Sequence, residues 1–281
     1  MSRRNRRWWV LIVFALVGCA TDVDADAVSV ATKTPPISPP ASSEMSQAGS
    51  PTEAASANAT SSPLRIPALV HQTITFGYSV RGQPLKVTEI GNPASAHRVL
   101  IVGSIHGNEL AGDRIAAALQ AGAPRGDADV WIVQELNPDG AAAATRQNAD
   151  GVDLNRNFPA HWQPLGARGA LDYSGTRALS EPESVAAVNL ISRIRPTLAI
   201  WFHQHLAVVD DSEGPTRVEQ RFSTLAGIPL ARLTDYPGSV TGWENSMFGP
   251  TAFVVELPAG QLSPAATKRY ADAIQAVETM N

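Results

Sequence analysis

The chain has 281 residues, enough for one or two domains, and its content of 44% hydrophobic and 17% charged residues is typical of globular proteins. Its formal net charge of -4 excludes a strongly basic domain, and binding to the phosphates of nucleic acid needs a basic face. The single cysteine excludes an internal disulfide. We therefore expect no nucleic-acid partner.

The N-terminus has the pattern of an export signal. Arginines at positions 3, 4, 6 and 7 precede an apolar run over residues 8–17, which is too short to span a bilayer as a helix. The run ends in Leu16-Val17-Gly18-Cys19, which resembles the bacterial lipobox, where the cysteine is lipidated and becomes the new N-terminus. We predict a signal peptide over 1–18, a lipid on Cys19, and anchoring in a bacterial cell envelope, at the outer membrane or the outer face of the cytoplasmic membrane. An ordinary signal peptide with a chance cysteine is the alternative.

Residues 19–66 are rich in Ala, Ser, Thr and Pro and contain few large apolar side chains. Such a segment cannot bury enough surface to offset its ordering entropy, so we expect a disordered tether that begins at the lipidated cysteine. Residues 67–281 alternate strand-like and helix-like stretches and are numerous enough for a good core. The sequence therefore predicts a single α/β domain over 67–281.

The first half of this domain begins with a buried strand. Residues 98–105 form a β-branched run that suits such a strand, residues 110–121 read as a helix, and residues 130–134 read as another strand. Asn137-Pro138-Asp139-Gly140 follows and predicts a turn.

The second half contains the clearest helix start, at Ser180-Glu181-Pro182-Glu183. Ser180 can cap this helix, Glu183 can complete a capping box, and Pro182 sits in the first turn, where proline is tolerated. The remaining predicted elements are strands over 198–202 and 252–257, a helix over 217–226 that stops at Gly227, and a last helix capped by Ser263.

Polar residues follow the predicted strands at their ends. His106 and Glu109 come after the first strand, and His203 comes after a later one. Glu256 stands at the end of the last strand. Because open α/β sheets gather their sites at strand ends, we expect these four residues to lie together.

The motif His106-Gly107-Asn108-Glu109 has the spacing His-x-x-Glu, which can turn an imidazole and a carboxylate toward one point. A catalytic zinc needs a third protein ligand and an open position for water, and His203 can supply that ligand. Taken singly, His203 also suits a buried histidine whose hydrogen bonds are satisfied within the core. These three residues by themselves leave both interpretations open.

The segment 151–159, Gly-Val-Asp-Leu-Asn-Arg-Asn-Phe-Pro, lies between these candidate ligands. Together with the His106 motif, the 137–140 turn and His203, it resembles the zinc metallocarboxypeptidase family of the carboxypeptidase A type over nearly the whole folded part. The compact domain and the Glu-Leu-Pro ending at 256–258 look closer to bacterial murein peptide amidases and γ-D-glutamyl-diaminopimelate peptidases. The resemblance implies a mixed, mostly parallel, twisted sheet with helices on both faces.

The resemblance also implies roles for residues that match the family's motifs. It implies one bound zinc ion, with the ligands His106, Glu109 and His203. Asp153 matches the carboxylate that orients a ligand histidine. Asn155 and Arg156 match the pair that holds the free carboxylate of the substrate, a task that suits the planar fork of arginine.

Further roles concern the reacting bond. Arg146 looks like the arginine that polarises the scissile carbonyl and stabilises the developing oxyanion. Glu256 matches the general base, and Tyr236 resembles a mobile tyrosine that caps the bound substrate, although a tyrosine before a proline also suits a simple turn. His205 stands two residues after His203, on the same side of a strand, and could compete as a ligand.

These roles predict a zinc peptidase that cuts an amide bond next to a free carboxylate, in murein-derived peptides such as those with a γ-D-Glu–diaminopimelate bond. A general metallocarboxypeptidase, a catalytically silent peptide-binding lipoprotein and a zinc deacylase of amino-acid conjugates are the alternatives. The expected pocket segment, 239–243, offers no acidic residue to select a basic side chain. The expected partners are the peptide substrate and, through the lipid anchor, a membrane.

Overall fold

The computed structural model describes residues 68–123, 126–211, 216–249 and 252–280. The predicted signal peptide, the lipidation site Cys19 and the predicted tether lie outside these residues. None of the helices in the described part of the chain is both long enough and apolar enough to cross a membrane.

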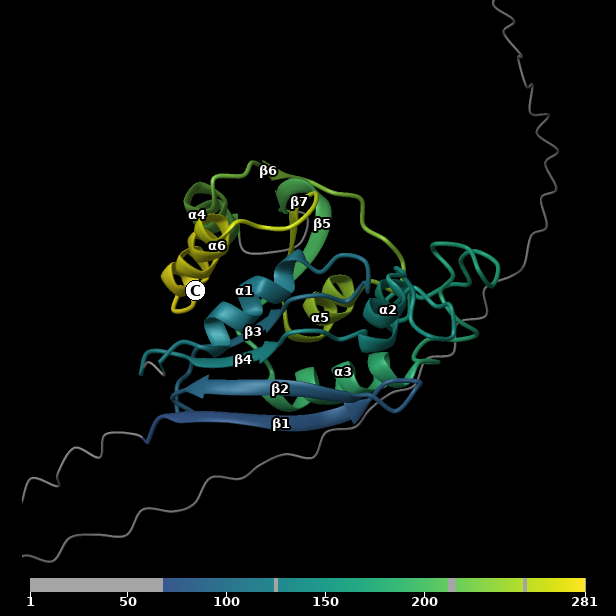
Figure 1. Cartoon of the computed structure of the whole chain (residues 1–281), viewed down its shortest axis with the longest axis horizontal. Coiled ribbons are helices and arrows are strands. Elements are labelled where there is room, and N and C mark those ends of the chain that lie inside the picture. Colours follow the sequence, from purple (N-terminus) through teal and green to yellow (C-terminus); the bar gives the residue numbers. More distant parts are fainter. Residues whose placement is uncertain (1–67, 124–125, 212–215, 250–251, 281) are drawn as a thin grey trace, which may run out of the picture. The chain divides into compact units, whose positions relative to one another are not determined.

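The strands form one mixed sheet with the order β1-β2-β4-β3-β5-β6, and β7 pairs with β5 off this path (Figure 1). The β1–β2 and β2–β4 pairs are antiparallel, whereas β4–β3, β3–β5, β5–β6 and β5–β7 are parallel. The carboxyl ends of the parallel strands therefore meet at one edge of the sheet. The strands are β1 Val70–Tyr78, β2 Pro84–Gly91, β3 Arg98–Val102, β4 Asp129–Val133, β5 Leu198–Asp210, β6 Leu230–Ala231 and β7 Ala252–Pro258.

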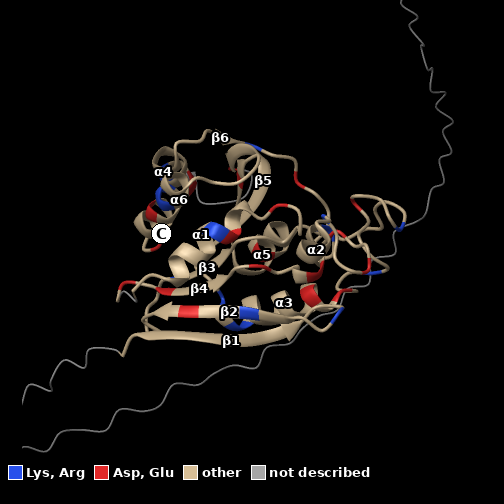
Figure 2. Ribbon diagram, viewed as in Figure 1, with Lys and Arg blue, Asp and Glu red and all other residues tan. Residues whose placement is uncertain are grey.

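Helices cover both faces of this sheet. Buried side chains of α1, α4 and α6 pack on one face, and those of α3 and α5 pack on the other. Acidic and basic residues are interspersed along the described elements (Figure 2). The helices are α1 Ala111–Gln120, α2 Pro138–Ala143, the 3₁₀ helix η1 Leu154–Arg156, α3 Pro182–Ile194, α4 Thr216–Ala226, α5 Val240–Phe248 and α6 Pro264–Val277.

The central strand β3 is apolar from Val99 to Val102 because both of its faces are buried. In β3, Val99 and Ile101 belong to the core beneath α1, α4 and α6, while Leu100 and Val102 belong to the opposite core. Successive side chains of a strand point to opposite faces, so a continuous apolar run fills two cores at once. The predicted α/β fold, with a mixed and mostly parallel sheet between two helical layers, is confirmed.

Two elements differ from their predictions in extent or type. The predicted turn at 137–140 is the start of helix α2, whose cap is the Asn137 side chain, which accepts a hydrogen bond from the Gly140 amide at 2.9 Å. Strand β5 continues to Asp210 instead of ending at residue 202. His203 therefore lies within β5, directly opposite Glu256 of β7 in the ladder.

The predicted capping box of α3 is wrong. Glu181 is the N-cap residue and makes no side-chain cap bond, and Ser180 Oγ donates to Glu181 Oε1 at 2.6 Å. The Glu183 carboxylate instead accepts hydrogen bonds from the Val80 amide at 3.0 Å and from Asn148 Nδ2 at 3.1 Å. These partners are distant in sequence, so tertiary contacts replaced the local cap. The Ser263 cap of α6 is confirmed, with a bond from the Ala266 amide at 3.2 Å.

Candidate active site

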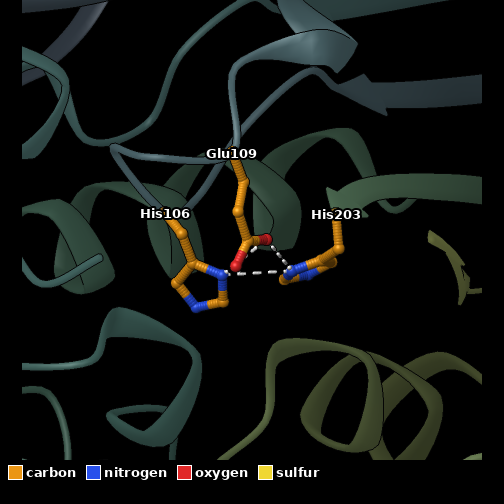
Figure 3. Close-up of side chains that lie close together, drawn as sticks. All are labelled: His106, Glu109 and His203. Atoms are coloured by element: carbon orange, nitrogen blue, oxygen red, sulfur yellow. Dashed lines mark hydrogen bonds and ion pairs between the residues drawn. The ribbon is translucent and has the colours of Figure 1, made fainter. Parts of the chain in front are cut away.

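Three potential metal ligands converge at the carboxyl edge of the sheet (Figure 3). His106 Nδ1 lies 3.0 Å from Glu109 Oε2, and His203 Nδ1 lies 3.1 Å from the same oxygen. The two Nδ1 atoms are 3.2 Å apart. All three residues are buried, and they come from the loop after β3 and from β5.

The loop between β3 and α1 has a glycine where it passes α2. A β-carbon on Gly107 would lie 2.0 Å from the Gly140 carbonyl carbon and 2.2 Å from the Ala141 nitrogen, which no other residue could accommodate without a shift. Within the loop the Glu109 amide donates to the His106 carbonyl at 3.1 Å. This tight turn brings the imidazole and the carboxylate to the same side.

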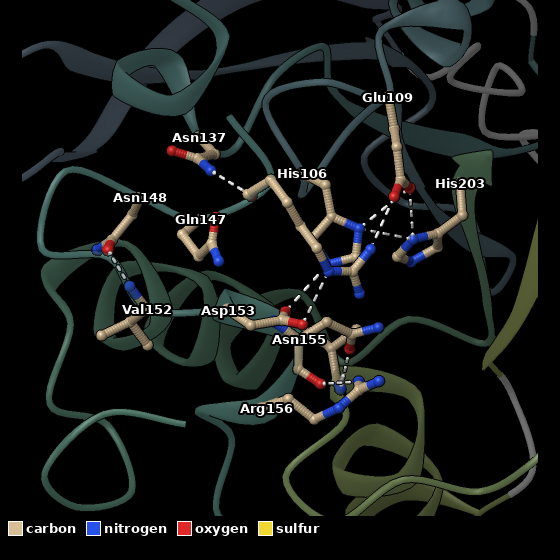
Figure 4. A network of polar contacts seen from close by, with 12 residues as sticks. His106, Glu109, Asn137, Gln147, Asn148, Val152, Asp153, Asn155, Arg156 and His203 are labelled. Atoms are coloured by element: carbon tan, nitrogen blue, oxygen red, sulfur yellow. Dashed lines mark hydrogen bonds and ion pairs between the residues drawn. The ribbon is translucent and has the colours of Figure 1, made fainter. Parts of the chain in front are cut away.

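Asp153 fixes the orientation of the His106 ring (Figure 4). Its Oδ1 lies 3.0 Å from His106 Nε2, and it also accepts a hydrogen bond from the Asn155 amide at 2.9 Å, as the cap of η1. A carboxylate only accepts hydrogen bonds, so Nε2 carries the proton and Nδ1 keeps its lone pair. Nδ1 is the nitrogen that faces Glu109 and His203.

The donor set suits zinc. Two imidazole nitrogens and one carboxylate oxygen are a ligand set typical of catalytic zinc, which retains a further position for water or substrate. The lone pair of His106 Nδ1 cannot donate to Glu109 Oε2, whereas a cation between the two would bind both. His203 Nε2 is buried and has no hydrogen-bond partner within the described residues.

The carboxylates of this centre are held in their ionised form. Burial alone would raise the pKa of Glu109, but its interactions with His106 and His203 outweigh burial and hold that pKa far below its usual range. The pKa of Asp153 is likewise low, because His106 and Arg146 outweigh the effect of burial. Burial would lower the pKa of His106, but Asp153 and Glu109 raise it. The centre therefore presents negative charge to a cation.

Arg146 bridges the two carboxylates. Its Nη1 donates to Glu109 Oε1 at 2.8 Å and its Nε donates to Asp153 Oδ2 at 3.0 Å. The side chain is 24% exposed and reaches the cavity beside the centre. The structure thus places Arg146 next to the candidate ligands, at the wall of that cavity.

A cavity of about 320 Å³ opens beside the centre. Glu109 and Asp153 are buried next to His106, and the other predicted site residues that the structure describes line the cavity wall. Those lining residues are His106, Arg146, Asn155, Arg156, His203, Tyr236 and Glu256. The fold therefore collects the predicted site residues in one place.

Arg156 is a buried guanidinium at the wall of this cavity. Its Nη1 donates to the Asn155 carbonyl at 2.7 Å, and its Cζ lies 4.0 Å from the centre of the Tyr236 ring. Its Nε is buried without a hydrogen-bond partner among the described residues. Burial lowers the pKa of Arg156, because a charged guanidinium loses hydration there. An anion bound in the cavity would replace the hydration that the guanidinium loses on burial.

Glu256 and Tyr236 occupy different depths of the cavity. Glu256 is half-buried on β7, and its Oε2 accepts a long hydrogen bond from the Leu206 amide at 3.4 Å. Tyr236 is 51% exposed and stacks on Arg156, so its ring lies in contact with solvent. His205 is exposed and is not among the residues that line the cavity.

The sequence analysis missed two carboxylates of the cavity. The expected pocket segment contributes Ser239, Thr241 and Gly242, but Asp210 at the end of β5 and Asp235 before α5 also line the wall. Asp210 was outside every predicted element because β5 was expected to end earlier. The loop that contains Asp235 has no periodic pattern to place it.

The chain matches known proteins over most of this domain. The profile of the zinc carboxypeptidase family matches residues 64–226. Murein peptide amidase A of Escherichia coli (strain K12) is 34% identical over 185 residues, which cover 60% of this chain and 74% of that protein. Murein peptide amidase A of Vibrio campbellii is 31% identical over 197 residues, which cover 66% of this chain and 78% of that protein.

Solved structures agree in fold. A murein-tripeptide amidase from Escherichia coli O157 superposes with a TM-score of 0.62 at 28% identity, covering 76% of this chain and 94% of that chain. Carboxypeptidase A from Helicoverpa armigera superposes with a TM-score of 0.66 at 19% identity, covering 73% of this chain and 67% of that chain. The family uses zinc, and the geometry above provides its site at His106, Glu109 and His203. The chain is a peptidase that belongs to the zinc carboxypeptidase family.

Proposed function

We propose that this peptidase hydrolyses the amide bond next to a free carboxylate in murein-derived peptides, with the γ-D-Glu–diaminopimelate bond as its target. The observation that carries the proposal is the shared cavity, in which the buried Arg156 lines the same wall as the candidate zinc ligands. The names of the murein peptide amidase relatives support the choice of murein over other peptides. That choice goes beyond the family's general peptidase activity.

The reaction is an addition of water to an amide carbon, followed by loss of the amine. When bound at His106, Glu109 and His203, zinc supplies Lewis-acid chemistry. Glu256 accepts a proton from the attacking water while the water oxygen bonds to the amide carbon. The C–N bond then breaks, and Glu256 returns the proton to the nitrogen of the leaving amine.

In this proposal two arginines each stabilise a different negative charge of the substrate. Arg146 faces the carbonyl and stabilises the oxyanion that develops on its oxygen. Arg156 binds the free carboxylate through its planar fork and thereby sets which amide bond lies over Glu256. Asn155 supports this position, because its Oδ1 accepts a bond from the Val240 amide at 2.9 Å and ties η1 to α5. Tyr236, stacked on Arg156, covers the bound end of the substrate.

We also propose that the protein is exported and anchored by a lipid on Cys19, in the bacterial envelope where murein lies. The support is the N-terminal sequence, in which arginines, an apolar run and Leu16-Val17-Gly18-Cys19 follow one another. Labelled palmitate should enter the full chain and should be absent from Cys19→Ser. Equal labelling of both chains would exclude lipidation at this cysteine.

The substrate proposal is tested with the zinc-loaded full chain and the tripeptide L-Ala-γ-D-Glu-meso-diaminopimelate. A peptide with the same residues joined through the α-carboxyl group of glutamate is the matched substrate. We expect release of diaminopimelate from the γ-linked peptide and none with Glu256→Gln. Cleavage of the α-linked peptide alone would make the protein a general carboxypeptidase, and binding of either peptide without turnover would favour a silent binding protein. Turnover of N-acyl amino acids alone would indicate a deacylase.

A further inference from the structure

The side chain of Gln204 uses both ends of its amide. Its Oε1 accepts a hydrogen bond from the Ala111 amide at 3.0 Å, and its Nε2 donates to the carbonyls of Pro258 and Gly260 at 2.9 and 2.8 Å. A carboxamide offers one oxygen and two N–H donors, so both kinds of group on this side chain are engaged. Gln204 is half-buried and is not among the residues that line the cavity, so its contacts are with the protein rather than with the substrate space.

The oxygen end of this amide holds the segment that carries a zinc ligand. Helix α1 begins two residues after Glu109, and its N-cap residue, Leu110, makes no side-chain cap bond. The first amides of a helix have no partner within the helix, and Gln204 supplies one from β5 to Ala111. The backbone amide of Gln204 also donates to Glu109 Oε2 at 3.1 Å, the oxygen that faces both ligand histidines. Gln204 therefore fixes the start of α1 and the Glu109 carboxylate together.

The nitrogen end of the amide holds the segment that follows the proposed base. Strand β7 ends at Pro258, two residues after Glu256, and Gly260 lies in the bend beyond it with a φ of 79°. The carbonyls of Pro258 and Gly260 meet at one NH2 group, so neither can move away without losing a hydrogen bond. The bond that Glu256 itself accepts, from the Leu206 amide, is long at 3.4 Å. The position of Glu256 therefore depends on how the end of β7 is held.

Gln204 follows the ligand His203 in β5 and projects to the opposite face of the sheet. Phe202 belongs to the core beneath α1, α4 and α6, and successive side chains of a strand alternate. Gln204 therefore lies on the α1 side, whereas His203 lies on the side of the cavity. One residue thus joins three segments that are far apart in sequence, which carry the ligand Glu109, the ligand His203 and the proposed base Glu256.

We propose that Gln204 is a positioning residue that sets the Glu256 carboxylate relative to the zinc ion, because the oxygen end of its amide holds the Glu109 ligand and the nitrogen end holds the base. The part that concerns Glu256 rests on the proposed function. A base acts only from within hydrogen-bond reach of the proton it accepts, so a small shift of β7 lowers the rate without releasing zinc. Loss of groups that orient metal ligands commonly costs about tenfold to a hundredfold in metal affinity or activity.

Two substitutions separate the ends of the amide. Gln204→Glu keeps an oxygen for the Ala111 amide and removes the N–H donors, whereas Gln204→Met keeps the length of the side chain and removes both. Competition with a chelator gives the zinc Kd, and kcat and KM are measured with the zinc-loaded full chain on L-Ala-γ-D-Glu-meso-diaminopimelate or its α-linked counterpart, whichever the wild type cleaves. For Gln204→Glu we expect kcat to fall about tenfold to a hundredfold, while KM and the zinc Kd change by less than about threefold. Gln204→Met should show the same fall in kcat and should also bind zinc about tenfold more weakly.

Gln220→Glu, at an exposed glutamine of α4, is the matched control and should equal the wild type in kcat, KM and zinc Kd. Parallel losses of zinc affinity and kcat in both Gln204 variants would mean that Gln204 only stabilises the fold. A wild-type kcat in Gln204→Glu would mean that the nitrogen end of the amide does not place the base. Either result overturns the inference.

A crystallographic comparison separates this inference from the proposed function. Crystal structures of the zinc-loaded wild type and of zinc-loaded Gln204→Glu give the distance from zinc to the Glu256 carboxylate without any substrate. We expect a longer distance in the variant, and an equal distance overturns the inference even when no peptide is cleaved. If the distance is longer and the zinc Kd is kept while neither peptide is turned over, the role of Gln204 stands and the proposed substrate is wrong.

Discussion

The guanidinium of Arg156 is held in a geometry that suits a planar anion. The Asn155 carbonyl fixes one nitrogen, and the Tyr236 ring covers one face of the plane. Lysine would keep the charge at this position but would lose the fork that binds both oxygens of a carboxylate. Recognition at the scale of this one residue thus depends on shape as well as on charge.

Arg156→Lys should lower kcat/KM for a peptide with a free terminal carboxylate by about tenfold to a hundredfold, because charge-assisted bidentate bonding is lost. The same peptide with a terminal carboxamide should respond much less. Both peptides are measured by steady-state kinetics, with Arg168→Lys, an exposed loop arginine, as the control. An equal loss on both peptides would show that Arg156 does not read the carboxylate.

At the scale of elements, the active site depends on how closely segments approach each other. The loop after β3 passes α2 at Gly107, and α5 packs on β5 through a bond from Trp201 Nε1 to Glu244 Oε2 at 3.0 Å. Neither contact is local in sequence. Both can be tested by single substitutions.

Gly107→Ala should destabilise the fold and weaken zinc binding. The added carbon would overlap the α2 backbone, and relief of such overpacking costs about 1–3 kcal/mol. Thermal unfolding and competition with a zinc chelator measure the two effects. Gly126→Ala is the control, because a β-carbon there would meet nothing within 4 Å. If Gly107→Ala kept the thermal stability and the zinc affinity of the wild type, this contact would not be what constrains the loop.

Glu244 makes stability depend on pH. Burial raises its pKa from the ordinary value of 4.5 to about 8, and Oε1 has no hydrogen-bond partner in the described part of the chain. Between these pH values the folded state keeps a proton that the unfolded chain releases, so stability falls as pH rises through this window. For the wild type, urea unfolding should give a lower free energy of unfolding at pH 9 than at pH 6. The free energy of unfolding of Glu244→Gln should fall less between these pH values. An equal fall in the variant and the wild type would assign the pH dependence to other groups.

At the scale of the whole molecule, the sheet joins the ligand histidine to the proposed base. Parallel pairing of β5 with β7 sets His203 opposite Glu256, although 52 residues (256 minus 203, less one) separate them along the chain. Zinc binds residues of the loop after β3 and of β5, so its binding energy stabilises the folded state as a whole.

Removal of zinc by a chelator should lower Tm. A ligand at a hundredfold excess over its Kd stabilises the folded state by about 2.7 kcal/mol, which corresponds to roughly 5–10 °C for a domain of this size. His203→Ala should abolish the shift, and His205→Ala, the exposed neighbour, should retain it. Loss of the shift in His205→Ala would make that residue a ligand, contrary to its position.

Much of the fold was predictable because short-range patterns decide it. The apolar run at 98–105 contains β3, the Ser263 cap begins α6, and the order of the ligand motifs indicated the family. The roles of Arg146, Arg156, Glu256 and Tyr236 stay predictions, although the structure places all four at one cavity. The α3 cap was predicted wrongly because Val80 and Asn148, which are far away in sequence, bind Glu183.

The sequence by itself determined strands β3, β4 and β7, helices α1, α3, α4 and α6, and which residue types a zinc centre would use, whereas β1, β2, β6 and α5 were not predicted. Only the tertiary structure decided that β5 extends to Asp210 and that this carboxylate enters the cavity beside Arg156. The physical reason is that a strand's length depends on its partners in the sheet, and residues 208–210 of β5 pair with β6 and β7. Those partners come from later segments of the chain, so no local pattern around residue 210 could report them.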